Sequence, residues 1–161
     1  MSQPDTATRS ATAGIDPRGP RFVAGVTAVL LLVDVFLGAL GVSAVALILL
    51  AALALLFAWG AFAGIQRGPW SILFRTAIRP RLSPPAELED PAPPTFAQGV
   101  GLFVTGVGVV LGIFFPVVVP IAAALAFVAA FLNSVFGYCL GCQIYLALVR
   151  AGVIRRRASV T

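Results

Sequence analysis

Residues 22–65 read FVAGVTAVLLLVDVFLGALGVSAVALILLAALALLFAWGAFAGI, and Asp34 is the one charged residue among them. A second apolar stretch, residues 96–149, contains no Asp, Glu, Lys or Arg at all. A helix of about 20 residues crosses the roughly 30 Å hydrocarbon core of a bilayer, so each stretch is long enough to cross it twice. The sequence therefore predicts an all-α membrane protein with four transmembrane helices.

Each apolar stretch contains one set of turn residues near its middle. In the first stretch the turn is expected at residues 38–43, with Ser43 as the N-cap of the second helix. In the second stretch Pro116 and Pro120 mark the turn, and Pro120 suits the first turn of a new helix. Within a transmembrane domain of residues 21–149, the predicted spans are residues 22–40, 43–65, 97–115 and 120–142, with a central loop at residues 66–96.

All eleven basic residues are arginines, and they form three clusters outside the predicted spans. Four spans place the three clusters on one side of the membrane, whereas the two opposite turns carry no charge. The positive-inside rule then puts both termini and the central loop in the cytoplasm. The clusters are Arg9, Arg18 and Arg21; Arg67, Arg75, Arg79 and Arg81; and Arg150, Arg155, Arg156 and Arg157.

The composition agrees with a membrane location. Hydrophobic residues make up 60% of the chain and the mean hydropathy is +1.02, values far above those of soluble domains. We attribute the net charge of +5 to arginines that fix the topology and contact anionic lipid headgroups. We therefore expect the lipid bilayer as a partner and no nucleic acid. Abundant Arg, Ala, Gly and Val without Lys are typical of a GC-rich bacterial genome, which suggests a bacterial inner membrane.

The two ends of the chain are expected to be cytoplasmic tails, at residues 1–20 and 150–161. The first is rich in Ser, Thr and Ala and is expected to be disordered. A cleaved signal peptide is the alternative reading of the first span, since Arg21 precedes an apolar run that ends in small residues. The long polar segment before that run and the second span directly after it favour a retained helix.

The two predicted hairpins share residues in register. Phe22, Gly25 and Val26 open the first span as Phe96, Gly99 and Val100 open the third. The segments 59–64 and 136–141 each begin with an aromatic residue and glycine and end in glycine. This similarity predicts two tandem parallel-repeat hairpins, with chance similarity between Gly-rich segments as the alternative.

Three GxxxG pairs allow close approach of helix backbones. Packing within the bundle is the simpler interpretation, and a homo-oligomer is the alternative. The pairs are Gly60 and Gly64, Gly108 and Gly112, and Gly137 and Gly141.

The central loop begins with an amphipathic pattern. From Trp70 to Arg79, apolar residues recur at helical spacing, which predicts a short helix at the membrane interface. Six prolines between Pro80 and Pro94 predict irregular structure after it. A solvated connector and a docking surface for a soluble partner both fit this segment.

Both cysteines lie in the segment Tyr138-Cys139-Leu140-Gly141-Cys142-Gln143. On a fourth span that continues to residue 142, the two thiols fall near one face, at a separation compatible with a disulfide. A polar stripe of Ser134, Tyr138, Cys142 and Tyr145 would line the same helix. The candidate redox pair is therefore Cys139 and Cys142, with supporting residues Tyr138, Gln143, Asn133 and Ser134.

The chemistry of this pair is open at the level of sequence. A CxxC spacing is a dithiol arrangement, and nearby arginines favour a thiolate. A position toward a helix C-terminus disfavours negative charge, and a reducing cytoplasm favours the dithiol at rest. Redox or sulfur-carrying chemistry, structural packing, and a metal shared between two subunits are the alternatives. No residue pattern identifies a cofactor.

Asp34 is the intramembrane acid. A carboxylate at the centre of a bilayer costs about 2.5–3.5 kcal/mol on insertion scales, so we expect a protonated group or a polar partner. Thr105 lies closer to its depth than Asn133 does, which predicts a hydrogen bond between the side chains of Asp34 and Thr105. A proton-coupled role is the alternative. The chain has no histidine, the commonest general base, so we expect no conventional acid–base catalysis by this protein alone.

Several blocks of this sequence are specific in combination: residues 15–22, 79–82, 85–90, 96–101 and 133–142, together with Tyr145. Together they resemble the bacterial membrane family known as domain of unknown function 4395. The resemblance covers residues 15 to about 150 and implies a compact membrane protein that ends in a CxxC helix. Some members of that family are associated with thioredoxin-like and sulfurtransferase neighbours, which implies a soluble partner of that kind.

These observations lead to two hypotheses. The first is thiol or sulfur redox handling through a cytoplasm-facing CxxC. The second is a non-catalytic membrane-complex subunit or small-solute transporter in which the cysteines pack.

Overall fold

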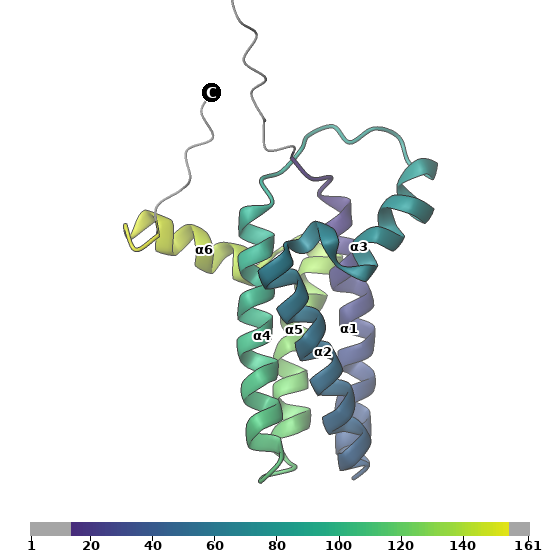
Figure 1. Ribbon diagram of the computed structural model, residues 1–161, viewed down its shortest axis with the longest axis vertical. Coiled ribbons are helices and arrows are strands. Elements are labelled where there is room, and N and C mark those ends of the chain that lie inside the picture. The colour runs from purple at the N-terminus through teal and green to yellow at the C-terminus, as the bar shows by residue number, and fades with distance from the viewer. Residues whose placement is uncertain (1–13, 155–161) are drawn as a thin grey trace, which may run out of the picture.

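A computed structural model describes residues 14–154 of the chain. Four long helices stand side by side in an upright bundle (Figure 1). Each is long and apolar enough to cross a membrane, which confirms the predicted all-α fold with four spans. These helices are α1 (Arg18–Ala39), α2 (Ser43–Ala63), α4 (Ala92–Gly112) and α5 (Val118–Phe136).

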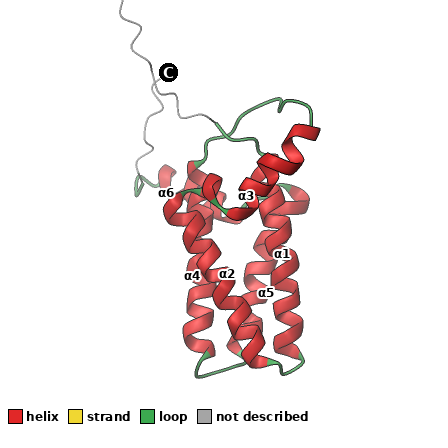
Figure 2. Cartoon of the chain, turned by 45° about the vertical axis from the view of Figure 1, so that its right-hand side comes forward, coloured by secondary structure: helices red, strands yellow, loops and turns green. Residues whose placement is uncertain are grey.

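The turn between α1 and α2 and the turn between α4 and α5 lie at one end of the bundle, where the sequence predicts them (Figure 2). Pro120 is in the first turn of α5, as expected for a residue with no N–H to donate. Ser43 is not the N-cap of α2, however. Val42 holds that position, and the Ser43 hydroxyl instead donates weakly to the Gly41 carbonyl at 3.5 Å.

The start of α4 differs from the prediction of irregular structure up to residue 96. The helix begins at Ala92, and its N–H donates to the Asp90 carboxylate at 2.9 Å. Pro93 and Pro94 fit in the first helical turn because the N–H groups there have no partner within the helix. Pro93 and Pro94 therefore belong to the first turn of α4 and do not interrupt it.

The first helix of each hairpin packs along the second helix of the other hairpin. Helix α1 lies on α5, and α2 lies on α4, with fewer contacts inside each hairpin. Close approaches of Gly25 to Ser134 and of Gly38 to Pro120 show that α1 and α5 run antiparallel. A two-fold axis between two repeated hairpins would also produce this pairing. The duplication itself stays a prediction from the sequence.

The bundle has a small apolar centre and an apolar outer surface. Leu31, Leu50 and Leu53 are at most 2% exposed and pack with small residues of α2 and α5. Large apolar side chains on the outside are the arrangement expected of helices surrounded by lipid, where no hydrophobic effect drives them inward. The most exposed of these include Phe36, Phe62, Phe103 and Phe114.

Only one of the three GxxxG pairs acts as a helix-packing pair. A Cβ atom at Gly112 would lie 2.5 Å from the Val119 side chain, and one at Gly108 would collide with Ala122, so both glycines seat α4 against α5. Gly64 has φ +89° beyond the end of α2, and Gly137 likewise lies beyond the end of α5. Packing within the chain therefore accounts for the Gly108 and Gly112 pair.

The seven described arginines all lie at one end of the bundle, which we call the arginine-rich end: Arg18, Arg21, Arg67, Arg75, Arg79, Arg81 and Arg150. Two lateral elements extend from this end (Figure 1). One is the continuous helical segment formed by α3 (Pro69–Leu73), Phe74–Ile78 and Arg79–Arg81, which confirms the predicted short helix. The other is α6 (Leu140–Arg150), which lies across the bundle axis.

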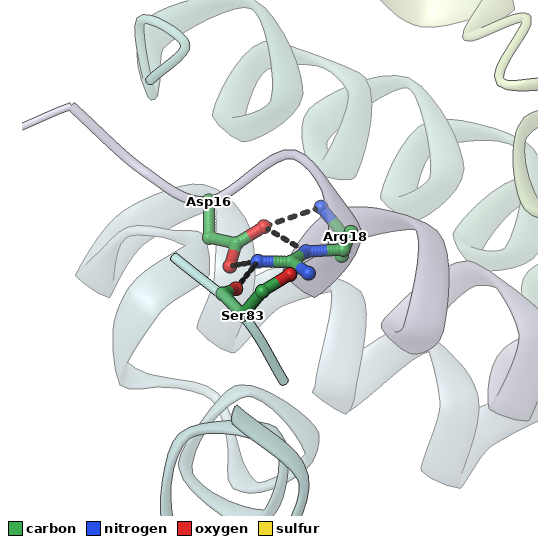
Figure 3. A network of polar contacts seen from close by, with 3 residues as sticks. All are labelled: Asp16, Arg18 and Ser83. Atoms are coloured by element: carbon green, nitrogen blue, oxygen red, sulfur yellow. Dashed lines mark hydrogen bonds and ion pairs between the residues drawn. The ribbon is translucent and has the colours of Figure 1, made fainter. Parts of the chain in front are cut away.

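The segment before α1 is ordered from residue 14, which corrects the expectation of a disordered tail up to residue 20. Ile15 and Glu89 exchange backbone hydrogen bonds at 2.8 and 2.9 Å. The Asp16 carboxylate forms an ion pair with Arg18 at 2.9 Å, and Arg18 also donates to the Ser83 carbonyl (Figure 3). Residues 1–13 and 155–161, including most of the predicted tails, lie outside the described part.

Candidate functional site

Helix α5 ends at Phe136 because Gly137 adopts a left-handed conformation, with φ +69° and ψ 14°. The N–H groups of Gly137 and Tyr138 donate to the carbonyls of Asn133 and Leu132, which satisfies the end of the helix. The prediction of one helix from residue 120 to residue 142 is therefore wrong. The glycine that the sequence suggested as a packing residue is a helix terminator.

Cys139 is the N-cap of the separate helix α6. Its carbonyl accepts the Gln143 N–H at 3.0 Å, and its Sγ accepts the Cys142 N–H at 3.2 Å. Cys139 and Cys142 are joined in a disulfide, with their Cα atoms 5.1 Å apart. The structure thus brings the predicted pair together, at the beginning of a helix.

This position reverses the electrostatic argument from sequence. The N-terminus of a helix presents unpaired N–H groups and positive potential, which favours a thiolate at Cys139. The Arg21 guanidinium adds a positive charge, since its Nη2 lies 3.0 Å from the point where a Cβ of Gly137 would be. Sequence reasoning missed Arg21 as a neighbour of this site, because the proximity arises from the pairing of α1 with α5.

Helix α6 is held in place by contacts with the first turns of α4. A Cβ atom at Gly141 would lie 2.5 Å from the Ala97 side chain, so the two helices touch there. Tyr145 is 9% exposed, and its ring packs on Phe96 with centroids 5.6 Å apart. These contacts fix the Cys139–Cys142 pair against the bundle at the arginine-rich end.

The other predicted site residues do not form a single stripe, because the break at Gly137 separates them. Ser134 faces α1, where its Oγ would lie 2.8 Å from a Cβ of Gly25. Tyr138 is 49% exposed and Gln143 is also exposed, so both flank the disulfide at the surface. Asn133 contributes its carbonyl to the cap of α5.

Asp34 is fully buried in the bundle, with 0% of its surface exposed. Thr105 is equally buried, but its hydroxyl donates to the Gly101 carbonyl at 2.8 Å. Neither carboxyl oxygen of Asp34 has a hydrogen-bond partner within residues 14–154. The predicted hydrogen bond between Asp34 and Thr105 is therefore wrong.

Metal ligands are few in this part of the chain. Residues 14–154 contain no group of three His, Cys, Asp or Glu side chains that could hold a metal ion. The chemistry that the site itself offers is that of two thiols which can form and break one disulfide bond.

The fold and the site together define a class: an all-α membrane protein of four apolar helices that presents a CxxC pair on a lateral helix. Residues 15–150 match the family described as Domain of unknown function (DUF4395). The chain belongs to this family. Neither the curated proteins nor the solved structures contain a match to the chain.

Proposed function

We propose that this protein carries out thiol–disulfide or sulfur exchange through Cys139 and Cys142. The observation that supports this proposal most directly is the position of Cys139 as the N-cap of α6, with its Sγ accepting the Cys142 N–H. Both cysteines are partly exposed, whereas a purely packing pair would be buried in the core. Cys139 is the attacking residue and Cys142 the resolving residue.

The exchange proceeds in two displacement steps. The Cys139 thiolate attacks a disulfide of the substrate, a mixed disulfide forms, and the first substrate sulfur leaves as a thiolate. The Cys142 thiol then loses its proton to water and attacks the Cys139 sulfur, which releases the second substrate sulfur as a thiolate. The substrate gains two electrons, and the cysteine pair becomes the disulfide of the structure.

A persulfide substrate follows the same course. Attack by Cys139 on the outer sulfur transfers that sulfur and releases the substrate thiolate. Attack by Cys142 on Cys139 then releases hydrosulfide and forms the disulfide.

The proposed partner is a soluble thioredoxin-like or sulfurtransferase protein in the cytoplasm of a bacterium, with this protein in the inner membrane. The arginine-rich end carries the cysteine pair, and the positive-inside rule supports a cytoplasmic position for such an end. A thioredoxin-like dithiol reduces the disulfide in each cycle, because the dithiol is the expected resting state in that compartment. Tyr138 and Gln143 flank the pair and shape the contact with the partner.

The test is thiol trapping with a mass tag in intact cells and inverted vesicles, before and after a disulfide or sulfane-sulfur challenge. We expect a pair that is labelled from the cytoplasmic side and converts reversibly to a disulfide or persulfide. The variant Cys142→Ser should accumulate a mixed disulfide at Cys139, whereas the matched variant Cys139→Ser should not. Serine is a strong N-cap, so the Cys139→Ser variant keeps the start of α6.

If both thiols stay reduced and unreactive under every challenge, the proposed exchange is contradicted and the cysteines are structural. The protein is then better explained as a membrane-complex subunit or a small-solute transporter.

A further inference from the structure

Asp34 is a buried acid that thiol exchange does not use. It lies in α1, and the long helices that pack on α1, which are α5 and α2, contribute no Asp, Glu, Lys, Arg or His. The fourth long helix, α4, contributes none either. The other charged residues of α1 are Arg18 and Arg21, three or more turns away at the arginine-rich end. A carboxyl group without hydrogen-bond or charge partners at this depth is costly to retain, and such a residue in a membrane protein is a first candidate for a functional site.

A small cavity lies between Asp34 and the arginine-rich end. It has a volume of about 20 Å³, which is room for about one water molecule. Helices α1, α2 and α4 form its walls, and the start of α3 covers it. Thr27, Trp70, Ser71 and Gln98 supply polar groups to its lining.

The lining of the cavity is suited to water. The indole N–H of Trp70 is buried and has no acceptor within residues 14–154, so a water molecule in the cavity would satisfy it. Ser71 donates to the Ile65 carbonyl at 2.6 Å, which holds the cover of the cavity together. The cavity thus provides a place for water just inside the arginine-rich end.

Thr27 connects the cavity with the face of α1 that carries Asp34. The two residues are seven positions apart, which is about 10 Å along the helix axis, and both point inward. Leu31 lies between them and is 0% exposed, and Leu53 closes the cavity from α2 at 2% exposure. Leu31 and Leu53 belong to one buried apolar cluster, which lies between the water site and the acid.

The ligand that fits a single carboxyl group is a proton. A metal cation needs several oxygen ligands, and no group of three potential metal ligands exists within residues 14–154. We propose that Asp34 is an intramembrane proton-binding site, which exchanges its proton with water from the arginine-rich end through the cavity beneath Trp70. In each exchange the carboxyl group gives one proton to water and takes one back, after Leu31 and Leu53 move apart.

Infrared spectroscopy of the protein in lipid vesicles tests this proposal. The C=O stretch of a protonated carboxyl group is distinct from the bands of a carboxylate, and it shifts on transfer from H₂O to D₂O. We expect such a band at neutral pH, absent from the Asp34→Asn variant, with slow exchange in the wild type. If Asp34→Asn removes no protonated-carboxyl band, the proposal is overturned.

Two alanine variants test the route. Leu31→Ala opens the barrier between the cavity and Asp34 and should speed the exchange several-fold. Val119→Ala shortens an equally buried side chain that packs on Gly112 toward the opposite end of the bundle, and should leave the exchange rate unchanged. Equal acceleration by both variants would overturn the proposed route.

A chemical measurement on the wild-type chain avoids any dependence on the folding of variants. A lipid-soluble carbodiimide reacts with protonated carboxyl groups at membrane depth, and mass spectrometry locates the adduct. We expect modification of Asp34 at neutral pH, whereas Asp16 and the acids of residues 87–90 lie outside the long helices and should react with a water-soluble carbodiimide instead. An Asp34 that remains unmodified by the lipid-soluble reagent contradicts the proposal.

Discussion

Gly137 adopts a backbone conformation that costs an L-amino acid about 1–2 kcal/mol, with φ at +69°. This one residue separates α5 from α6 and turns the chain from the bundle axis to a lateral direction. It also leaves room for Arg21, which would lie 3.0 Å from any Cβ atom at this position. The conformation of Gly137 therefore places Cys139 at a helix start, beside a positive charge.

Substitution of Gly137 by alanine should lower the free energy of unfolding by about 1–2 kcal/mol, because alanine must adopt the left-handed conformation. Displacement of Arg21 can relieve only the steric part of this cost. The matched variant is Gly99→Ala, since Gly99 lies inside α4 with open space around it. Alanine there should be neutral or stabilise by up to about 1 kcal/mol.

Thermal unfolding in detergent, followed by circular dichroism, compares the two variants. A Gly137→Ala variant as stable as the Gly99→Ala variant would show that the chain does not need the left-handed turn. The rate at which a small dithiol exchanges with the Cys139–Cys142 disulfide gives a second readout. This rate should change in the Gly137→Ala variant and stay the same in the Gly99→Ala variant.

At the scale of the elements, contact between α4 and α5 depends on residues without side chains. Lipid is as apolar as leucine, so no hydrophobic effect draws these helices together, and close backbone packing stabilises the pair instead. Gly108 and Gly112 face Ala122 and Val119, which allows this approach. Gly106, two positions before Gly108 on the same helix, has open space around it.

The contrast between these glycines predicts the effect of valine substitutions. Gly108→Val should destabilise the protein by about 1–3 kcal/mol, because the added side chain must push α4 away from α5. Gly106→Val introduces the same side chain into the same helix and should have little effect. Thermal unfolding of both variants in one lipid mixture measures the difference, and equal midpoints would contradict the packing role of Gly108.

Hydrogen bonds join the segment before α1 to the connector before α4, which are far apart in the sequence. Ile15 pairs with Glu89, and Arg18 bridges Asp16 and the Ser83 carbonyl. The hydrogen bond from Arg18 lowers the pKa of Asp16 below its ordinary value of 3.8, with smaller contributions from the Arg18 N–H and the charges of Arg18 and Arg79. Burial of Asp16 acts in the opposite direction but does not cancel this effect.

The lowered pKa of Asp16 predicts a dependence of stability on pH. The folded protein holds this proton less tightly than the unfolded chain, so the contribution of Asp16 is present above pH 3.8 and is lost as the pH falls through the folded value. Asp16→Asn should remove this part of the acid sensitivity. Unfolding midpoints from neutral pH to below 3.8 measure it, with Glu87→Gln on the exposed connector as the control.

Much of the fold was predictable from local composition. The absence of charge between residues 35 and 65 and its return at Arg67 mark the end of α2, and Pro120 marks the start of α5. The lateral helix α6 was not predictable in this way, because residues 137–142 also fit a continuing helix. Glycine is tolerated inside transmembrane helices, and cysteine is not a typical N-cap residue.

The amino-acid sequence alone was enough to predict four helices long and apolar enough to cross a membrane, arginines grouped outside these helices, and two cysteines close enough to bond. These properties depend on hydropathy and on spacing along the chain, which are local quantities. The packing of α1 on α5 became visible only in three dimensions; it brings Arg21 to Gly137, and Asp34 is buried without a hydrogen-bond partner among residues 14–154. Such contacts depend on which helix faces lie together, because packing joins residues far apart in the chain.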